Sequence, residues 1–195
     1  MRLTCKYLPV VSFLALLGSA AAQFVFAAGM GGGGPTVPIT LTGVTETSFG
    51  LIDVTVGAGN IDMGTNGNIV YGAGYSGSGV GIAGGFTING DAGFNVNISC
   101  SATAVLANAS GSTMTISAVE AVVDRANNAG AFGAGSACAG LGNTIIVHSI
   151  RNNSAQNAIA VGMRINGTGG VPLGAGLFST SNAGGVPVTF DVVYV

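Results

Sequence analysis

The sequence predicts an all-β protein, an antiparallel β-sandwich, and three observations support that prediction. Apolar and polar residues alternate with a period of two along several segments, as in strands with one buried face and one wet face. Turn-forming pairs, among them Asn66-Gly67 and Asn166-Gly167, separate these segments. Residues 118–125 come closest to a helical pattern, but three valines and the lack of a preceding cap argue against a helix there.

The expected strands follow one another from residue 37 to the end of the chain. The best marked lies at 94–100, where Phe94, Val96 and Ile98 alternate with polar residues. The last, at 186–195, is expected to close the sandwich, and its core-facing side comprises Val188, Phe190, Val192 and Tyr194. The other strands are expected within 37–42, 86–89, 113–118 and 159–165.

The first 22 residues have the three parts of a secretory signal peptide. Arg2 and Lys6 form a basic region, residues 8–17 an apolar region, and residues 18–22 a cleavage site of small residues. The apolar region is too short to span a bilayer, which needs about 20 residues. We therefore expect cleavage after residue 22, with residue 21 as the alternative, and no membrane span in the mature chain.

An extension with a glycine-rich tether is expected at 23–36, ahead of a single sandwich domain at 37–195. The four consecutive glycines at 31–34 have no side chains to pack and behave as flexible coil. Before them, an extended chain would carry an apolar stripe along one side, which consists of Phe24, Phe26, Ala28 and Met30.

Composition and charge exclude several classes of protein. Only 6% of the residues are charged and 48% are hydrophobic, which is the opposite of a disordered chain. Without residues 1–22, three arginines and seven acidic residues remain, a net charge of −4 with no lysine. Such a chain cannot neutralise a run of phosphates, so we expect no nucleic acid among its partners.

Two cysteines, Cys100 and Cys138, remain in the mature chain, and an even pair in an exported protein is expected to form a disulfide. The alternative is a thiolate zinc site, which wants four ligands, and His148 is the only other soft candidate. Asp53 and Asp62 lack the closely spaced acids of a calcium site. We therefore expect neither a metal nor a cofactor.

No set of residues has the pattern of a catalytic site, so we expect no enzymatic activity. His148 is the only histidine and lies in a strand-like run, where a packed or surface position is the simpler interpretation. Glu120 and Asp124 lie next to an arginine and are typical of a solvated loop or edge. Residues 79–84 fit G-x-G-x-x-G, but an expected strand follows them where a dinucleotide fold needs a helix.

Three stretches carry a resemblance to a known family. They are 47–52 (TSFGLI), 86–98 (FTINGDAGFNVNI, a hairpin-like pair around a Gly-acid-Ala-Gly turn) and the last strand with its penultimate Tyr194. Together they resemble exported bacterial fimbrial-subunit-like domains of unassigned function and, more distantly, the pilins of chaperone–usher pili. The disulfide of such pilins commonly lies near the start of the domain, whereas Cys100 and Cys138 lie in the middle of this one.

The resemblance implies an immunoglobulin-like, pilin-like sandwich that is exported through the periplasm to the cell surface or beyond. Its implied function is that of a structural subunit or minor component of a fimbria or pilus, assembling through strand complementation. The implied partners are copies of itself or related pilin-like subunits, together with a periplasmic assembly chaperone.

Two further interpretations remain open. The extension 23–30 is a donor strand for the next subunit, a strand that folds back on its own domain, or a leftover of signal processing. The alternative function is a secreted or surface binding module for carbohydrate or host-surface adhesion, acting as a monomer. Residues 71–75 (YGAGY) are the one place where such a module would present aromatic rings.

Overall fold

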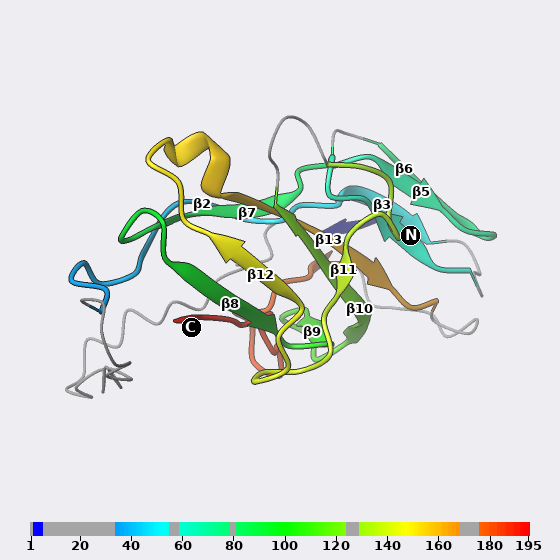
Figure 1. Cartoon of the computed structure of the whole chain (residues 1–195). Helices are drawn as coiled ribbons and strands as arrows, with labels where there is room; N and C mark the ends of the chain where they lie inside the picture. The colour runs from blue at the N-terminus through cyan, green and yellow to red at the C-terminus, as the bar shows by residue number, and fades with distance from the viewer. Residues whose placement is uncertain (1, 6–33, 55–58, 79–80, 124–128, 168–175) are drawn as a thin grey trace.

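The computed structural model describes residues 2–5, 34–54, 59–78, 81–123, 129–167 and 176–195. Among these residues the structure consists of β-strands and one short 3₁₀ helix, without any α-helix (Figure 1). The predicted all-β class is therefore confirmed. In chain order, the strands run from β1 near the N-terminus to β15 at the C-terminus.

The first eight strands are β1 Arg2–Cys5, β2 Thr40–Thr45, β3 Gly50–Val54, β4 Ile61–Met63, β5 Ile69–Tyr71, β6 Tyr75–Ser78, β7 Gly84–Asn89 and β8 Asn95–Cys100. The rest of the elements are β9 Ala104–Ala107, β10 Thr113–Val123, β11 Ser136–Ala137, β12 Ile146–Ser149, η1 Ser154–Asn157, β13 Ala158–Ile165, β14 Gly176–Leu177 and β15 Phe190–Tyr194.

The strands of the described residues form three sheets. The largest runs in the order β11-β10-β13-β4-β5, and it also contains β9 beside β10, β7 beside β13 and β2 beside β7. The second has the order β12-β8-β15, and the third the order β14-β1-β3-β6. All pairings are antiparallel except that of β1 with β14. This arrangement is sandwich-like, because the first two sheets share one core.

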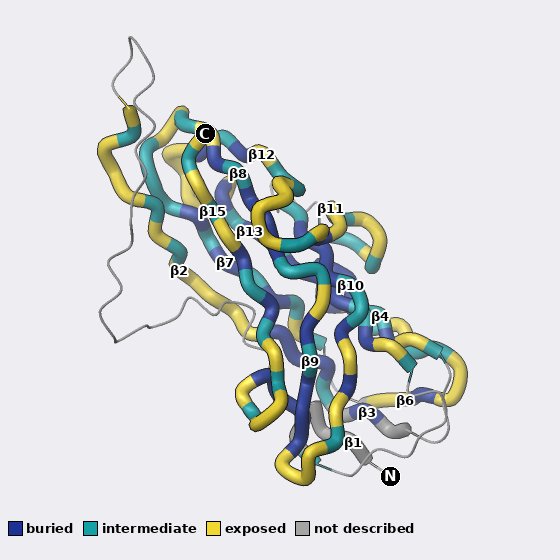
Figure 2. Tube along the Cα trace, turned by 90° about the horizontal axis from the view of Figure 1, so that it is seen from below, coloured by how far each residue is buried: buried dark blue, intermediate teal, exposed yellow. Residues whose placement is uncertain are grey.

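The core lies between the largest sheet and the second sheet. Phe86 on β7 contacts Phe190 on β15 edge to face, with ring centroids 5.1 Å apart. Strand alternation builds this core as the sequence predicts: the apolar residues of β7 and β8 are buried and their polar neighbours are more exposed (Figure 2). Fully buried residues from the two sheets include Ile88, Val96, Ile98, Ile116 and Val161, and Val188 just before β15 is fully buried as well.

The expected hairpin at 86–98 is wrong. β7 belongs to the largest sheet and β8 to the second, so the two strands do not pair. Residues 90–94 instead carry the chain from one layer to the other, with Gly93 at a φ of 88° and the amide of Phe94 bonded to the carbonyl of Asp91. Both strands turn an apolar side to the same core, and strands in opposite layers satisfy that requirement as well as a hairpin does.

Some strand limits also differ from the sequence expectations. The strand expected at 37–42 pairs only from Thr40 onward, after Pro38, which cannot donate to a ladder. The strand expected at 113–118 continues to Val123, so the segment that came closest to a helix is part of β10. β15 begins only at Phe190, while Val186 forms an isolated bridge with Val105.

The predicted disulfide is present and connects the two layers. Cys100 ends β8 in the second sheet, and Cys138 follows β11 in the largest sheet, with 5.2 Å between their Cα atoms. Backbone hydrogen bonds hold both ends, because Cys138 donates to the carbonyl of Val119 and Gly140 donates to that of Cys100. Cys100 is fully buried, as its place in the alternation of β8 requires.

Replacing both cysteines by alanine is expected to lower the free energy of unfolding by about 4 kcal/mol, because the bond closes a loop with a sequence separation of 38 residues. Chemical denaturation of the oxidised protein and of the variant measures the difference. The reduced wild type is the matched control, since it keeps the native side chains and should lose a similar amount. An unchanged denaturation midpoint in both would contradict the prediction.

Candidate assembly site

A strand slot lies between β3 and β14, and β1 fills it (Figure 1). β1 pairs antiparallel with β3, from Arg2 opposite Asp53 to Cys5 opposite Gly50. On its other side it pairs in parallel with β14 at Gly176 and Leu177. Within the described residues, β1 is the link that joins β3 to β14, and it comes from the segment that the sequence predicts to be a signal peptide.

The two walls of this slot are held by different parts of the fold. β3 pairs on its far side with β6, and the preceding Ser48 forms a bridge with Ile82. The β14 wall continues into Ser179, which exchanges backbone hydrogen bonds with Ala107 at the end of β9. The side chain of Asn182 also donates to the carbonyl of Ala107, at 2.8 Å. Each wall is therefore anchored independently of β1.

Large apolar side chains border the slot and belong to the core. Ile52 on β3 is fully buried, and so are Phe49 just before it and Phe178 just after β14. Tyr75, at the start of β6, is only 8% exposed. A slot with such a border favours an occupant that carries apolar side chains on one side.

The start of the domain is fixed by a second group of contacts, which we call the Asp91–Tyr194 clamp. The carboxylate of Asp91 accepts hydrogen bonds from the amide and hydroxyl of Thr36 and, at 2.9 Å, from the amide of Val37. The hydroxyl of Tyr194 donates to the carbonyl of Val37 at 2.8 Å and accepts the amide of Asp91 at 2.7 Å. Three distant segments, at 36–37, 91 and 194, therefore meet at one carboxylate and one hydroxyl.

Gly90 and Phe94 complete the clamp. A Cβ at Gly90 would lie 2.3 Å from the hydroxyl oxygen of Tyr194, so the position leaves no room for a side chain. The ring of Tyr194 packs edge to face on Phe94, with centroids 6.1 Å apart. The pKa of Asp91 is held below its ordinary value by hydrogen bonds that stabilise the carboxylate. The largest contribution comes from the backbone amide of Val37 and the next from that of Thr36.

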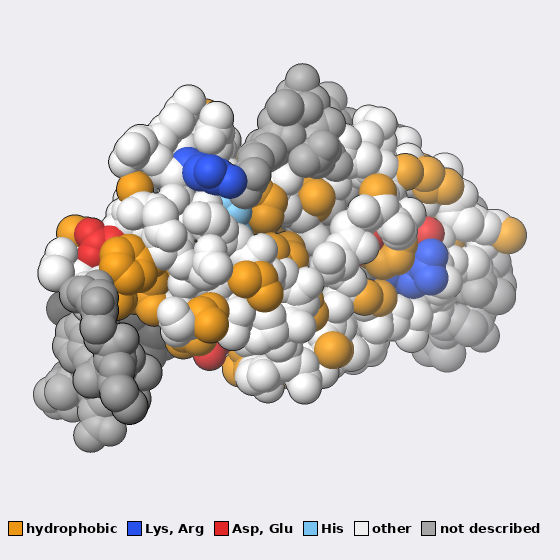
Figure 3. Space-filling model, viewed as in Figure 1, with side chains coloured by type: hydrophobic (Ala, Val, Ile, Leu, Met, Phe, Trp, Pro, Cys, Tyr) orange, Lys and Arg blue, Asp and Glu red, His pale blue; other side chains and the backbone are white. Residues whose placement is uncertain are grey.

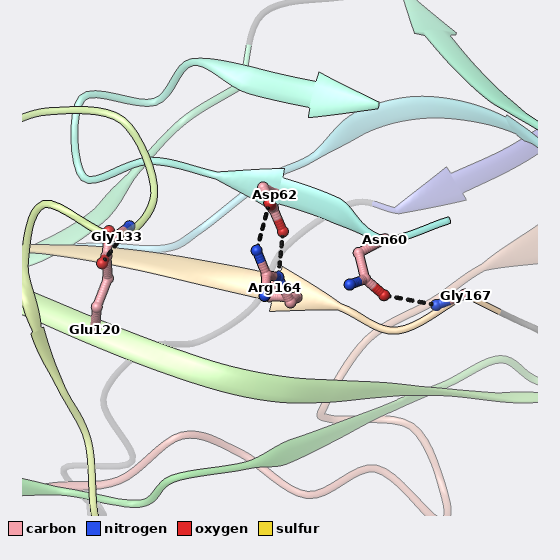
Figure 4. Close-up of polar contacts among 6 residues, drawn as sticks. All are labelled: Asn60, Asp62, Glu120, Gly133, Arg164 and Gly167. Atoms are coloured by element: carbon pink, nitrogen blue, oxygen red, sulfur yellow. Dashed lines mark hydrogen bonds and ion pairs between the residues drawn. The ribbon is translucent and has the colours of Figure 1, made fainter. Parts of the chain in front are cut away.

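A charged cluster lies on β4 and β13 (Figure 4). Arg164 binds both carboxylate oxygens of Asp62, at 2.6 and 2.7 Å, and its guanidinium lies 4.8 Å from the ring centre of Phe132. The hydrogen bonding of the Arg164 guanidinium to the carboxylate of Asp62 raises the pKa of Arg164. Since the two side chains are 36% and 23% exposed, solvent screens the pair and its contribution to stability is modest.

Glu120 is buried in this region, so its expected place in a solvated loop or edge is wrong. It lies in β10, is 3% exposed, and its Oε2 accepts the amides of Gly133 and Gly135 at 2.7 and 3.2 Å (Figure 4). The carboxylate thus holds the loop before β11 against the sheet. A Cβ on Gly162 of the paired strand β13 would lie 2.7 Å from Oε1 of Glu120, which explains a glycine inside that strand.

His148 has a structural environment. It is 1% exposed on β12, and its Nε2 lies 2.9 Å from the side-chain oxygen of Asn157 in η1. That oxygen also accepts the amide of Arg151, and the Asn157 amide group donates to the Arg151 carbonyl. The packed position expected for His148 is therefore found. Across the described segments, no three His, Cys, Asp or Glu residues form a group that could hold a metal ion.

The other residues singled out by the sequence lie as follows. In the closing strand, Val188 and Phe190 are buried, while Val192 and Tyr194 are half-buried against the core. The stripe of Phe24, Phe26, Ala28 and Met30 lies outside the described residues, as do Asp124 and the tether glycines up to 33. Among the residues of the alternative binding module, Tyr71 is half-buried, which raises its pKa, and Tyr75 is buried.

Sequence reasoning did not find the clamp or the slot. Asp91 is the acid of the Gly-acid-Ala-Gly turn expected within 86–98, and its carboxylate contacts lie 54 and 55 residues away in the sequence. The face in Figure 3 does not single out a site, because its few charged side chains lie in several separate places and hydrophobic ones are scattered among them. In the described part of the chain, no helix is long and apolar enough to cross a membrane.

The Asp91–Tyr194 clamp predicts an acid-dependent loss of stability. Because the pKa of Asp91 is depressed in the folded state, its contribution is present above the unfolded-state pKa of about 4 and is lost as the pH falls through the folded-state value. The stability difference between the wild type and Asp91→Asn should therefore shrink as the pH is lowered from about 6 to about 2. Denaturation across that range measures it, with Asp191→Asn on the exposed side of β15 as the control; a constant difference would refute the assignment.

Comparison with known proteins adds no relative. A scan against protein-family models, a search of curated proteins and a search of solved structures each gave no match.

Proposed function

We propose that the mature chain is a non-enzymatic structural subunit, or minor component, of a bacterial surface appendage of the fimbria or pilus kind, and that it assembles by strand complementation. The observation that carries the proposal is the position of β1. A strand from the predicted signal peptide completes the pairing of β3 and β14, so export would remove the occupant of the slot.

An open slot would need a new strand. Without β1, the facing edges of β3 and β14 would have unpaired backbone amides and carbonyls, and the neighbouring Ile52 and Phe178 would lose cover. Such an edge is a template for a strand from another chain, in which backbone hydrogen bonds supply affinity and alternate side chains supply specificity. An occupant with an apolar stripe would fit this border.

The N-terminal extension is the candidate occupant. Its stripe of Phe24, Phe26, Ala28 and Met30 has the period of a strand, and the tether at 31–34 would let it reach away from its domain. The extension joins the domain at Thr36, beside the C-terminus, whereas β1 and β3 lie toward the opposite end of the molecule (Figures 1 and 2).

This separation favours transfer of the strand to another copy over folding back. A contact that joins two different ends of identical subunits is heterologous, and when it does not close into a ring it produces an open filament. In this proposal the fold is of the immunoglobulin-like, pilin-like kind, the chain passes through the periplasm, and an assembly chaperone occupies the slot until the next subunit arrives. The resemblance of 47–52, 86–98 and 186–195 to fimbrial subunits supports these finer statements.

Assembly of the mature chain, residues 23–195, tests the proposal. Electron microscopy and sedimentation should show fibres for the wild type and only monomers for Phe24→Ser/Phe26→Ser, because serine removes the apolar anchors of the strand. Val25→Ser is the matched control, since Val25 lies on the other side of an extended chain. The melting temperature of the monomer should be the same in all three proteins.

A peptide with the sequence of residues 23–34 provides a second arm. Added in excess, it should occupy the slot, shorten the fibres and raise the melting temperature of the monomer, while the doubly serine-substituted peptide should do neither. A wild-type chain that stays monomeric and does not bind the peptide would overturn the proposal. N-terminal sequencing that finds residues 2–5 retained in the exported protein would overturn it as well.

A further inference from the structure

We infer that Asp91 and Tyr194 are positioning residues for the N-terminal extension, which they hold at the point where it leaves the domain. This inference rests on the proposed function, because it assigns a role in delivering the extension to another subunit. Neither residue would touch the slot of its own chain, since the clamp lies at the end of the molecule away from β1 (Figure 1).

Several hydrogen bonds hold Thr36 and Val37 to Asp91 and Tyr194. Thr36 and Val37 direct two amides and one hydroxyl at a single carboxylate oxygen of Asp91. The carbonyl of Val37 is bound in addition by the hydroxyl of Tyr194. Hydrogen bonds to a charged acceptor are stronger than neutral ones, so these contacts fix the local backbone direction well.

Few other contacts hold Thr36 and Val37. Val37 is 47% exposed, and regular pairing of β2 with β7 starts only at Thr40 opposite Asn89. The described contacts of Thr36 are those with Asp91. Ile39 packs against the core, so without the clamp the described backbone would be held only from about Ile39 onward, and the direction of residues 34–38 would no longer be set.

The Asp91–Tyr194 clamp is itself held in place by further contacts. The amide of Asp91 is bound to the hydroxyl of Tyr194, so the carboxylate and the hydroxyl are connected to each other as well as to the extension. Tyr194 is held by the pairing of β15 with β8, in which it lies opposite Val96, and by the ring of Phe94. Gly90 lies against the hydroxyl without a side chain to displace it. The start of the extension is thus bonded to β15, an edge strand of the second sheet that pairs with the central strand β8.

A fixed starting direction matters for assembly because the association of two specific patches is limited by orientation. When the residues next to the predicted tether have a fixed direction, fewer tether conformations are able to bring the strand back toward its own surface. The clamp would therefore raise the rate at which the strand enters another copy, without contributing any contact to the completed slot.

The test compares mature chains with Tyr194→Phe, Asp91→Asn and Gly90→Ala. Tyr194→Phe removes only the hydroxyl, and Asp91→Asn removes the charge but keeps the shape. Gly90→Ala keeps the hydroxyl and the carboxylate but adds a Cβ that collides with the hydroxyl. Asp191→Asn, a charge removal on the exposed side of β15, is the control. Hydrogen exchange is measured at each amide, and fibre growth is followed by light scattering.

We expect the amides of Thr36 and Val37 to exchange at least about tenfold faster in Asp91→Asn, as the loss of bonds to a charged acceptor implies. Core amides such as those of Ile98 and Val161 should change much less, which separates local release from global unfolding. Fibre growth should slow several-fold in all three variants and stay at the wild-type rate in Asp191→Asn, while the finished fibres should be equally stable.

The outcomes separate this inference from the proposed function. Faster exchange at Thr36 and Val37 with unchanged fibre growth would overturn the positioning role and leave the subunit proposal intact. Unchanged exchange at these amides would show that other contacts hold the stretch, which also overturns the inference. Absence of fibres from the wild type would overturn both.

Discussion

This structure depends on one constraint, which is that the backbone groups along each strand edge need hydrogen-bond partners. Polar groups of the backbone are costly to bury unpaired, and the largest sheet and the second sheet satisfy theirs through strands of the predicted sandwich domain. β3 and β14 are different, because residues 2–5 pair with both. The proposed function follows from this dependence. If the predicted signal peptide is removed, β1 is lost, and β3 and β14 need another strand between them.

The chain has few charged residues, and two of its carboxylates, that of the buried Glu120 and that of the partly exposed Asp91, bind nearby backbone amides. The carboxylate of Glu120 secures the loop of Gly133 and Gly135, and that of Asp91 secures Thr36 and Val37. In both cases one acidic oxygen collects amides that belong to no ladder. The disulfide between Cys100 and Cys138 adds a covalent connection between the two layers, which the apolar core otherwise holds together by packing.

The sequence predicted the class of the fold and the buried faces of its clearest strands, since a period of two identifies which side of a strand is apolar. It did not predict which strands are neighbours. Phe86 and Val96 point to the same core from opposite layers, and their alternation is equally compatible with a hairpin, so the expected pairing was wrong. Short strands such as β4 and β14 contain too few residues to show a period. The role of Asp91 depends on partners more than fifty residues away, and no local pattern near it carries that information.

The contact between Gly90 and the hydroxyl of Tyr194 makes the two positions interdependent. A methyl group at position 90 meets side-chain atoms, the hydroxyl of Tyr194 at 2.3 Å and a methyl of Ile150 at 2.9 Å, and not a backbone wall. The obstacle to a larger residue at 90 therefore consists of side-chain atoms, and a change at 194 would remove the closest of them. Gly162 differs, because the carbonyl of Met63 would lie 2.8 Å from its Cβ and no side-chain change would move it. Over evolutionary time, glycine at 90 and tyrosine at 194 should thus be gained and lost together, whereas glycine at 162 should persist whatever stands at 120.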